Sequence, residues 1–410
     1  MQFHQHTTAN GLQIIGETNP AAHSVSIGFF VRTGSRDETP QESGVSHFLE
    51  HMVFKGTEKR TFDMVNRDFD RIGASHNAYT SEEHTVFYAM LLPEFLPQAI
   101  DIYADILRPS LRESDFEMEK QVILDEIGMY ADQPYWVAYD HVRKLFFDNH
   151  PLGNTVLGTT ESIQALTRQQ MLDYFQRRYL TSNIVVVAAG NFEFARLVAE
   201  IERACAHWPN GSAPRQACPQ PTAKPCVQIL SKPGVAQEYV MAYAPGPAND
   251  SPLRYAVSLL SMAVGDETGS RLARELVDPG HADTADMGWS EYDGAGLIHT
   301  SFCCDPERTQ RNLHIVQQVL AEVQANNITA AELQQVKNKA NSRLVRSAER
   351  SQGRMRAIAA SWIMQHEYLD VDAELAAIDA VSLDDIRAVL DQYPLTEFTT
   401  LAYGPLEQLA

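Results

Sequence analysis

The chain has 410 residues, more than one ordinary hydrophobic core accommodates, which predicts at least two domains. Hydrophobic residues make up 44% and charged residues 21% of the sequence, as in ordinary globular proteins. The net charge of −20, from 33 basic and 53 acidic residues, argues against a nucleic-acid-binding protein, which needs a basic surface.

The start of the chain and its cysteines bear on the compartment. The opening residues, MQFHQHTTANGLQ, have neither a basic start nor an apolar stretch, and no apolar run of about 18 residues follows. The sequence therefore predicts neither a secretory signal nor a membrane span. The 5 cysteines are odd in number and show no CxxC spacing, which argues against a cysteine-built zinc site. We expect a cytoplasmic protein, or a periplasmic one if a signal was removed before the numbered chain begins.

The first predicted elements are a strand over residues 24–31, a polar turn and a helix over residues 44–55. Apolar residues recur in the helix at i, i+3, i+4 and i+7, the pattern of a face that packs against a core. They are Val45, Phe48, Leu49 and Met52. Gly56 is expected as the C-cap, because glycine readily adopts the left-handed conformation that commonly ends a helix.

The polar side of this helix carries His47, Glu50 and His51 in the order HxxEH. Residues three and four apart stack on one side of a helix, so both imidazoles can reach one zinc ion and the carboxylate can reach a water on it. This order is the inverzincin signature, and its chance occurrence in such a chain has a probability on the order of 0.02. The sequence predicts His47 and His51 as metal ligands and Glu50 as the general base.

A catalytic zinc ion needs a third protein ligand and one open position. The next predicted helix, SDFEMEKQVILDEIGMY, offers Glu117, Glu119, Asp125 and Glu126. Glu119 and Glu126 are seven residues apart, which is two helical turns, so they share a face. Periodicity alone leaves the choice between them open.

The stretch WPNGSAPRQACPQPTAKPC is rich in Pro, Ala, Ser and Gln and has no hydrophobic period, which predicts a linker. After it, a strand over residues 237–244, a Pro/Gly turn and a helix over residues 251–264 repeat the order of the first half. We expect an α+β protein of two homologous domains, each a mixed or antiparallel sheet covered by helices. The expected boundaries are 1–208 for the zinc-binding domain, 209–225 for the linker and 226–410 for a second domain without a metal site.

The segment HFLEHMVFKGT resembles the active-site helix of the pitrilysin-type metallopeptidases, the family that includes the mitochondrial processing peptidase. The similarity also covers NGLQII, HNAYTSEEHTVFYA and NIVVVAAGNF in the first half. It implies a zinc-dependent endopeptidase with one zinc ion per chain, Glu126 as third ligand and Glu119 as an outer residue that orients a ligand. It also implies two domains of one fold per subunit, forming half of a clam-shell around a chamber, as in the short processing-peptidase branch.

The resemblance further implies substrate contacts. Asn77 and Ala78 match an edge strand to which a peptide backbone adds, although the residues alone favour an interior strand whose edge is already paired. Phe54, Tyr79 and Trp136 match a hydrophobic side-chain pocket in relatives, although aromatic residues near helices are often plain core.

The second half lacks a feature of active relatives, in which an Arg and a Tyr seven residues apart stabilise the oxyanion of the substrate. In those relatives the pair follows a helix that the segment GSRLAREL resembles. After this segment, however, Val277 and Thr284 stand at the positions expected for the Arg and the Tyr. None of Arg271, Arg274 and Tyr292 restores the spacing. The resemblance therefore implies a heterodimer with a homologous subunit that supplies the Arg/Tyr pair, with a homodimer as the alternative.

Two other functions stay open at this point. One is a non-catalytic assembly subunit of the same fold, although such subunits lose parts of HxxEH and this chain keeps all of it. The other is a zinc hydrolase of a non-peptide amide.

Overall fold

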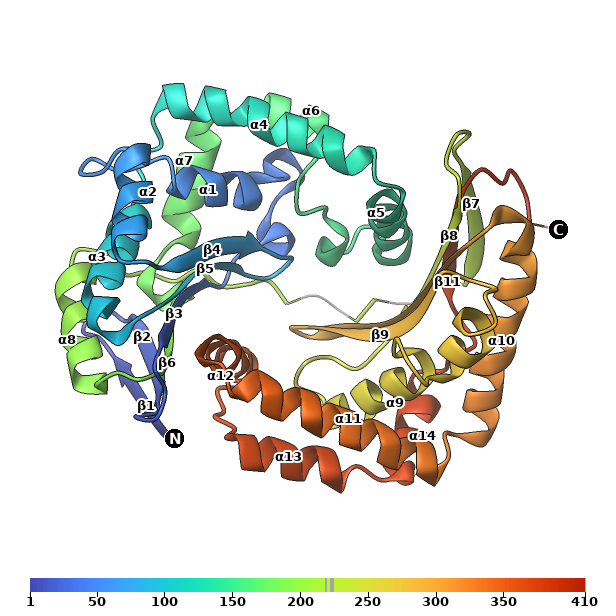
Figure 1. Cartoon of the computed structure of the whole chain (residues 1–410). Helices are drawn as coiled ribbons and strands as arrows, with labels where there is room; N and C mark the ends of the chain where they lie inside the picture. Colours follow the sequence, from blue (N-terminus) through green and yellow to red (C-terminus); the bar gives the residue numbers. More distant parts are fainter. Residues whose placement is uncertain (218–219, 222–224, 410) are drawn as a thin grey trace. The chain divides into compact units, whose positions relative to one another are not determined.

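The computed structural model of the chain describes residues 1–217, 220–221 and 225–409 (Figure 1). It contains two compact units. The first comprises Met1–Gly128, Asn154–Gln216 and Arg346–Leu369, and the second comprises Met129–Gly153, Ala217–Val345 and Asp370–Ala410. Each unit therefore includes a helical segment from the opposite side of the predicted linker. The described part of 209–225 forms no helix or strand, while residues 218–219, with Cys218, and 222–224 lie outside the described residues.

The first unit is built on a six-stranded sheet with the order β1-β2-β6-β3-β5-β4. β2 and β6 are parallel and the other neighbours are antiparallel, so the sheet is mixed. β3 and β6 are buried along their whole length, because both faces of the sheet are covered. β4 lies at one edge of this sheet. The strands are β1 (Gln2–Thr7), β2 (Gln13–Thr18), β3 (Val25–Val31), β4 (Ser75–Thr80), β5 (Thr85–Leu91) and β6 (Ile184–Gly190).

Helices from the first half of the chain pack on one face of this sheet and form a continuous apolar core with it. Phe29 of the sheet and Phe48, Phe69 and Tyr103 of the helices lie in this core. The helices are α1 (Val45–Val53), α2 (Phe62–Arg71), α3 (Leu96–Ile106), α4 (Glu113–Ala131), α6 (Thr160–Ala165), α7 (Arg168–Arg178) and α8 (Phe194–Cys205).

The opposite face of the same sheet is covered by α12 (Ser351–Gln365), which comes from the second half of the chain. Its apolar side chains pack against Ile15, Phe30 and Val187. Arg354 of α12 donates from Nε and Nη2 to the two carboxylate oxygens of Glu17 on β2, at 2.9 and 2.6 Å. Both side chains are almost completely buried, so this ion pair links the helix to the sheet inside the core.

The second unit is built on a five-stranded sheet with the order β7-β11-β8-β10-β9. Helices α9, α10, α11, α13 and α14 contribute to an apolar core on one face, and α5, from the first half of the chain, packs on the other. The strands are β7 (Cys226–Ser231), β8 (Glu238–Pro245), β9 (Thr284–Tyr292), β10 (Ala295–Cys304) and β11 (Thr399–Gly404). The helices are α5 (Pro134–Phe147), α9 (Arg254–Gly265), α10 (Thr309–Asn326), α11 (Ala330–Ala348), α13 (Val371–Ala380) and α14 (Leu383–Gln392).

These observations confirm the expected α+β class, with helices covering a mixed sheet in each unit. The strand expected at 24–31 is β3, and the helix expected at 44–55 is the shorter α1. The C-cap is Phe54, so the expectation that Gly56 caps the helix was wrong: Gly56, with φ +114°, lies two residues beyond the observed cap. Among the described cysteines, Cys205, Cys226, Cys303 and Cys304 are free.

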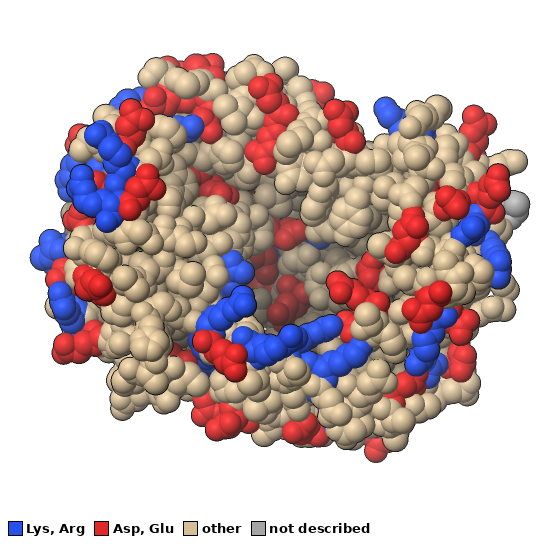
Figure 2. All heavy atoms as spheres, viewed as in Figure 1, with Lys and Arg blue, Asp and Glu red and all other residues tan. Residues whose placement is uncertain are grey.

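Charged side chains of both signs are interspersed on the face shown in Figure 2, including the region over α2 and α3. There Arg60 pairs with Asp68, Asp101 and Asp105 at 3.0, 2.6 and 2.8 Å. None of the described helices combines the length and apolar character that crossing a bilayer requires.

Candidate metal centre

The position of helix α1 is fixed by its buried apolar face and by hydrogen bonds at its N-terminus. Its apolar stripe is fully buried, as expected. At its N-terminus, the carboxylate of Glu38 accepts the backbone N–H groups of Gly44 and Ser46 at 2.7 and 2.8 Å. These bonds satisfy donors that have no partner inside the helix. Gly44 has φ +89°, and a Cβ there would lie 2.6 Å from the carbonyl oxygen of Leu157, so this turn requires glycine.

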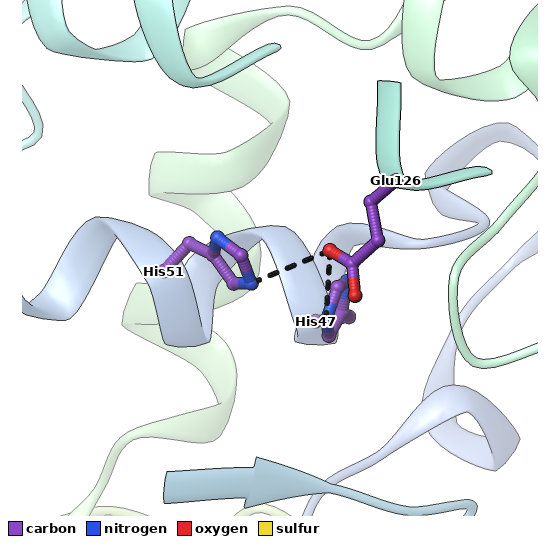
Figure 3. Close-up of side chains that lie close together, drawn as sticks. All are labelled: His47, His51 and Glu126. Atoms are coloured by element: carbon purple, nitrogen blue, oxygen red, sulfur yellow. Dashed lines mark ion pairs between the residues drawn. The ribbon is translucent and has the colours of Figure 1, made fainter. Parts of the chain in front are cut away.

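Three side chains meet on the polar face of α1 (Figure 3). His47 and His51 project from α1, and Glu126 reaches them from α4. The distance from Glu126 Oε2 is 3.8 Å to His47 Nε2 and 3.7 Å to His51 Nε2. One ligand atom from each residue lies within 4.8 Å of the other two. The structure thus brings together Glu126, and not Glu117 or Asp125, with the two histidines.

The donor set fits zinc. Two imidazole nitrogens and one carboxylate are a common protein complement of a catalytic zinc ion, with ligand bonds of about 2.0–2.2 Å. The side chain of His47 is 11% exposed, whereas those of His51 and Glu126 are 26% and 23% exposed. The group is therefore partly accessible to solvent, as a site that admits a water or a substrate must be.

The surroundings select the form of each histidine. Burial, together with the charge of His51, lowers the pKa of His47 to about 3, so this imidazole is neutral at physiological pH. Burial also disfavours charge on His51, but the hydrogen bond to Glu119 and the charges of Glu126 and Glu50 outweigh it and raise its pKa. His51 Nδ1 lies 2.9 Å from Glu119 Oε1, which fits an N–H donated to that carboxylate and leaves Nε2 facing Glu126.

Glu119 lies behind the group. Its side chain is 4% exposed, and its second oxygen is 2.5 Å from Lys55 Nζ. Burial alone raises the pKa of a carboxyl group, but the hydrogen bonds from His51 and Lys55 hold the pKa of Glu119 below its usual value. Glu119 therefore contacts the candidate ligand His51 and is not a member of the group. Lys55 was missed by the sequence analysis, because nothing in the local pattern links it to a carboxylate on another helix.

Glu50 lies on α1 between the two histidines in sequence. Burial raises the pKa of its carboxyl group, with a further contribution from the charge of Glu126. Thr80 Oγ1, at the end of β4, donates to Glu50 Oε2 at 2.6 Å. The motifs in the sequence do not indicate a role for Thr80. Side chains alternate between the two faces of a strand, so the spacing from Ala78 indicates that Thr80 lies on the same face of β4 as Ala78.

The residues predicted to contact substrate are only partly brought together. Asn77 and Ala78 lie on β4, an edge strand of the sheet, which favours the edge over the interior alternative. Phe54 packs toward the face covered by the first-half helices, with its ring centroid 6.0 Å from that of Phe87. Tyr79 projects to the opposite face, where its ring lies 5.9 Å from the Arg356 guanidinium of α12. Trp136 belongs to α5 in the second unit.

The second unit shows the positions expected for the missing Arg/Tyr pair. Val277 packs against the apolar core, and Thr284 is the first residue of β9. Arg271 is engaged in two hydrogen bonds to the Glu332 carboxylate, at 2.9 and 2.8 Å. Tyr292 is buried, and its hydroxyl accepts a hydrogen bond from Arg143 at 2.9 Å.

Comparison with known proteins assigns this chain to a family. Residues 13–160 match the model of the insulinase family, peptidase family M16, and residues 165–340 match that of the peptidase M16 inactive domain. An uncharacterized zinc protease of Mycobacterium tuberculosis is 31% identical, over 97% of this chain and 92% of its own. The mitochondrial-processing peptidase subunit beta of Saccharomyces cerevisiae is 29% identical, over 92% of this chain and 85% of its own. The crystal structure of a protease from Helicobacter pylori superposes with a TM-score of 0.92 at 21% identity, covering 98% and 99% of the two chains. The chain therefore belongs to peptidase family M16 and is similar to zinc proteases along nearly its whole length.

Proposed function

We propose that this chain is the zinc-bearing subunit of an endopeptidase. The observation that carries the proposal is the convergence of His47, His51 and Glu126, with Glu50 on the same helix. The names of the relatives, zinc protease and processing peptidase, support this choice.

In the proposed mechanism, His47 Nε2, His51 Nε2 and the Glu126 carboxylate would hold a zinc ion. When bound, zinc lowers the pKa of a water and polarises a carbonyl group. Glu50 accepts the proton of the attacking water and passes it to the leaving amine. Glu119 keeps the imidazole of His51 oriented through its hydrogen bond to Nδ1.

The substrate of the proposed enzyme is a peptide in extended conformation. β4 is an edge strand, so its outer backbone groups are a place where a peptide can add as a further strand. Asn77 and Ala78 lie in the middle of this strand, and Asn77 is exposed. We further propose a homologous partner subunit that supplies the oxyanion donors. The reason is that Val277 and Thr284 have no guanidinium or phenol group to donate hydrogen bonds to an oxyanion.

The test is the variant Glu50→Gln, assayed on a quenched-fluorescent peptide with zinc content measured in parallel. We expect turnover to fall by about 10²- to 10⁴-fold or more while the zinc stoichiometry stays at one per chain, because Glu50 moves a proton and does not ligate the metal. Glu58→Gln, an exposed carboxylate just beyond α1, is the matched control and should behave as wild type. Loss of zinc from Glu50→Gln would contradict the role, and cleavage of non-peptide amides only would contradict the substrate class.

A further inference from the structure

Thr80 is the one side chain of the described residues that hydrogen-bonds Glu50. Its hydroxyl donates to Glu50 Oε2 at 2.6 Å, a length typical of strong bonds between a hydroxyl and a carboxylate. The other carboxylate oxygen, Oε1, accepts no hydrogen bond from the described residues. The two oxygens of the proposed base are therefore not equivalent in this structure.

The strand register directs the Thr80 hydroxyl to this place. Successive side chains of a strand point to opposite faces, so Ala78 and Thr80 share one face of β4 and Tyr79 takes the other. Ala78 packs against the core formed with the helices, and α1 contacts β4 directly. Because threonine is branched at Cβ, its side chain has few rotamers, and its hydroxyl is held toward α1.

The turn that follows Thr80 is fastened to the rest of the first unit. Thr80 pairs with Thr85, and the backbone N–H of Ser81 donates to the carbonyl of His84 at 2.8 Å. The carbonyl of Glu82 accepts the backbone N–H of Arg36 at 2.9 Å. Glu83 forms a buried ion pair with the side chain of Arg36. These contacts fix the end of β4 without any contribution from a substrate.

We propose that Thr80 is a positioning residue for the general base. Its hydroxyl occupies Oε2 and restrains rotation of the Glu50 carboxylate, so that Oε1 is the oxygen that accepts the proton. The inference rests on the proposed role of Glu50. It adds that one rigid strand serves two purposes, since the outer edge of β4 receives the peptide and its last side chain orients the base.

The test compares Thr80→Val, which keeps the shape but loses the hydroxyl, with Thr80→Ser, which keeps a hydroxyl. For Thr80→Val we expect kcat on the fluorescent peptide to fall by about 10- to 100-fold, with KM within about twofold of wild type. Thr80→Ser should recover most of kcat. Zinc affinity in a chelator titration should be the same in all three proteins, because Thr80 does not touch a ligand.

A readout independent of turnover uses the metal-free protein. The effects of Thr80→Val and Glu50→Gln on the urea unfolding midpoint should be non-additive in the double variant, because both alter the same hydrogen bond. If Thr80→Val does not fold, Thr80→Ala removes the same hydroxyl with less bulk.

The outcomes separate this inference from the proposed function. An inactive Glu50→Gln beside a Thr80→Val with unchanged kcat would overturn the role of Thr80 and leave the function standing. Zinc loss in Thr80→Val, or failure of Thr80→Ser to recover kcat, would also overturn it. An active Glu50→Gln would remove the proposed function itself.

Discussion

His47 and His51 stand one turn apart on α1, yet their surroundings push their proton affinities in opposite directions. His47 is buried without a carboxylate at hydrogen-bond distance, and its pKa falls to about 3. His51 donates to Glu119 and faces two further carboxylates, and its pKa rises above the ordinary value of 6.5 despite burial. His47 is therefore neutral at any physiological pH, and His51 takes up a proton at a higher pH than an ordinary histidine.

This difference predicts the proton count of zinc binding. As pH falls through the raised pKa of His51, zinc affinity should weaken about tenfold per pH unit, with one proton released per zinc bound. His47 contributes no second proton, because its pKa lies far below this range. Calorimetric titration of the metal-free protein in buffers of different ionisation enthalpy measures the number directly. Protonation of the His47 imidazole near pH 6, seen in an NMR titration of the metal-free protein, would contradict its assignment as the neutral partner.

The two glutamates of α4 differ in their contacts, which predicts different losses. Glu126→Gln should weaken zinc binding far more than Glu119→Gln, because removal of an outer residue costs about 10- to 100-fold and loss of a ligand costs more. Asp125→Asn is the matched control on the same helix, since Asp125 is hydrogen-bonded to Gln121 and not to the group. A chelator titration of the three variants ranks them. Equal or reversed losses for Glu119 and Glu126 would mean that the ligand is misassigned.

At the scale of elements, α5 and α12 each pack on a sheet whose strands come from the other half of the sequence. α12 closes the second face of the sheet that carries β4, and its Arg354 reaches the buried Glu17. Although burial raises the pKa of a carboxyl group, hydrogen bonds from Arg354 and Tyr368 hold the pKa of Glu17 below its usual value. Its contribution to stability is thus present above the unfolded-state pKa and is lost as pH falls through the lowered folded-state pKa.

Arg354→Met should therefore destabilise the first unit by about 3–5 kcal/mol, because Glu17 would remain buried without its cation. Arg350→Met, an exposed arginine preceding the same helix, is the control and should change stability little. Urea unfolding followed by fluorescence provides the measurement. The double variant Glu17→Met/Arg354→Met should recover much of the loss, since an apolar pair of similar volume replaces the ion pair. A single variant as stable as wild type would show that the pair does not hold the helix.

At the scale of the whole molecule, the candidate metal ligands His47, His51 and Glu126 belong to the first unit, and Val277 and Thr284 of the second unit stand at the positions expected for the Arg/Tyr pair. Arg271 and Tyr292, the nearest residues of the right kinds, are already bonded to Glu332 and Arg143. Loss of one oxyanion donor costs about 10²- to 10³-fold in rate, so the chain alone should be a weak peptidase.

We predict that a homologous subunit with the Arg/Tyr pair raises activity on the fluorescent peptide by at least about 10²-fold. The measurement is cleavage by the purified chain, by the partner and by their mixture, with the molar mass of each sample determined by light scattering. The same mixture made with Glu50→Gln is the control, and it should be inactive. Full activity of the chain alone, as a monomer or homodimer, would contradict the need for a partner.

The sequence alone determined the local features of this protein. The 3.6-residue apolar period and the HxxEH spacing predicted α1 and its polar face, because both depend only on helix geometry. The α+β class followed in the same way from the alternation of strand and helix patterns. The choice of Glu126 over Glu119 came from the family resemblance, because periodicity does not distinguish two residues that lie on the same face of a helix.

Tertiary structure alone decided which distant residues meet. Thr80 and Lys55 contact Glu50 and Glu119 only because a strand end and a second helix pack against α1. Likewise, the apolar faces of α5 and α12 show that each helix needs a sheet to cover but do not say which sheet. A hydrophobic face is satisfied by any partner of suitable shape, so its identity is set by how the whole chain folds.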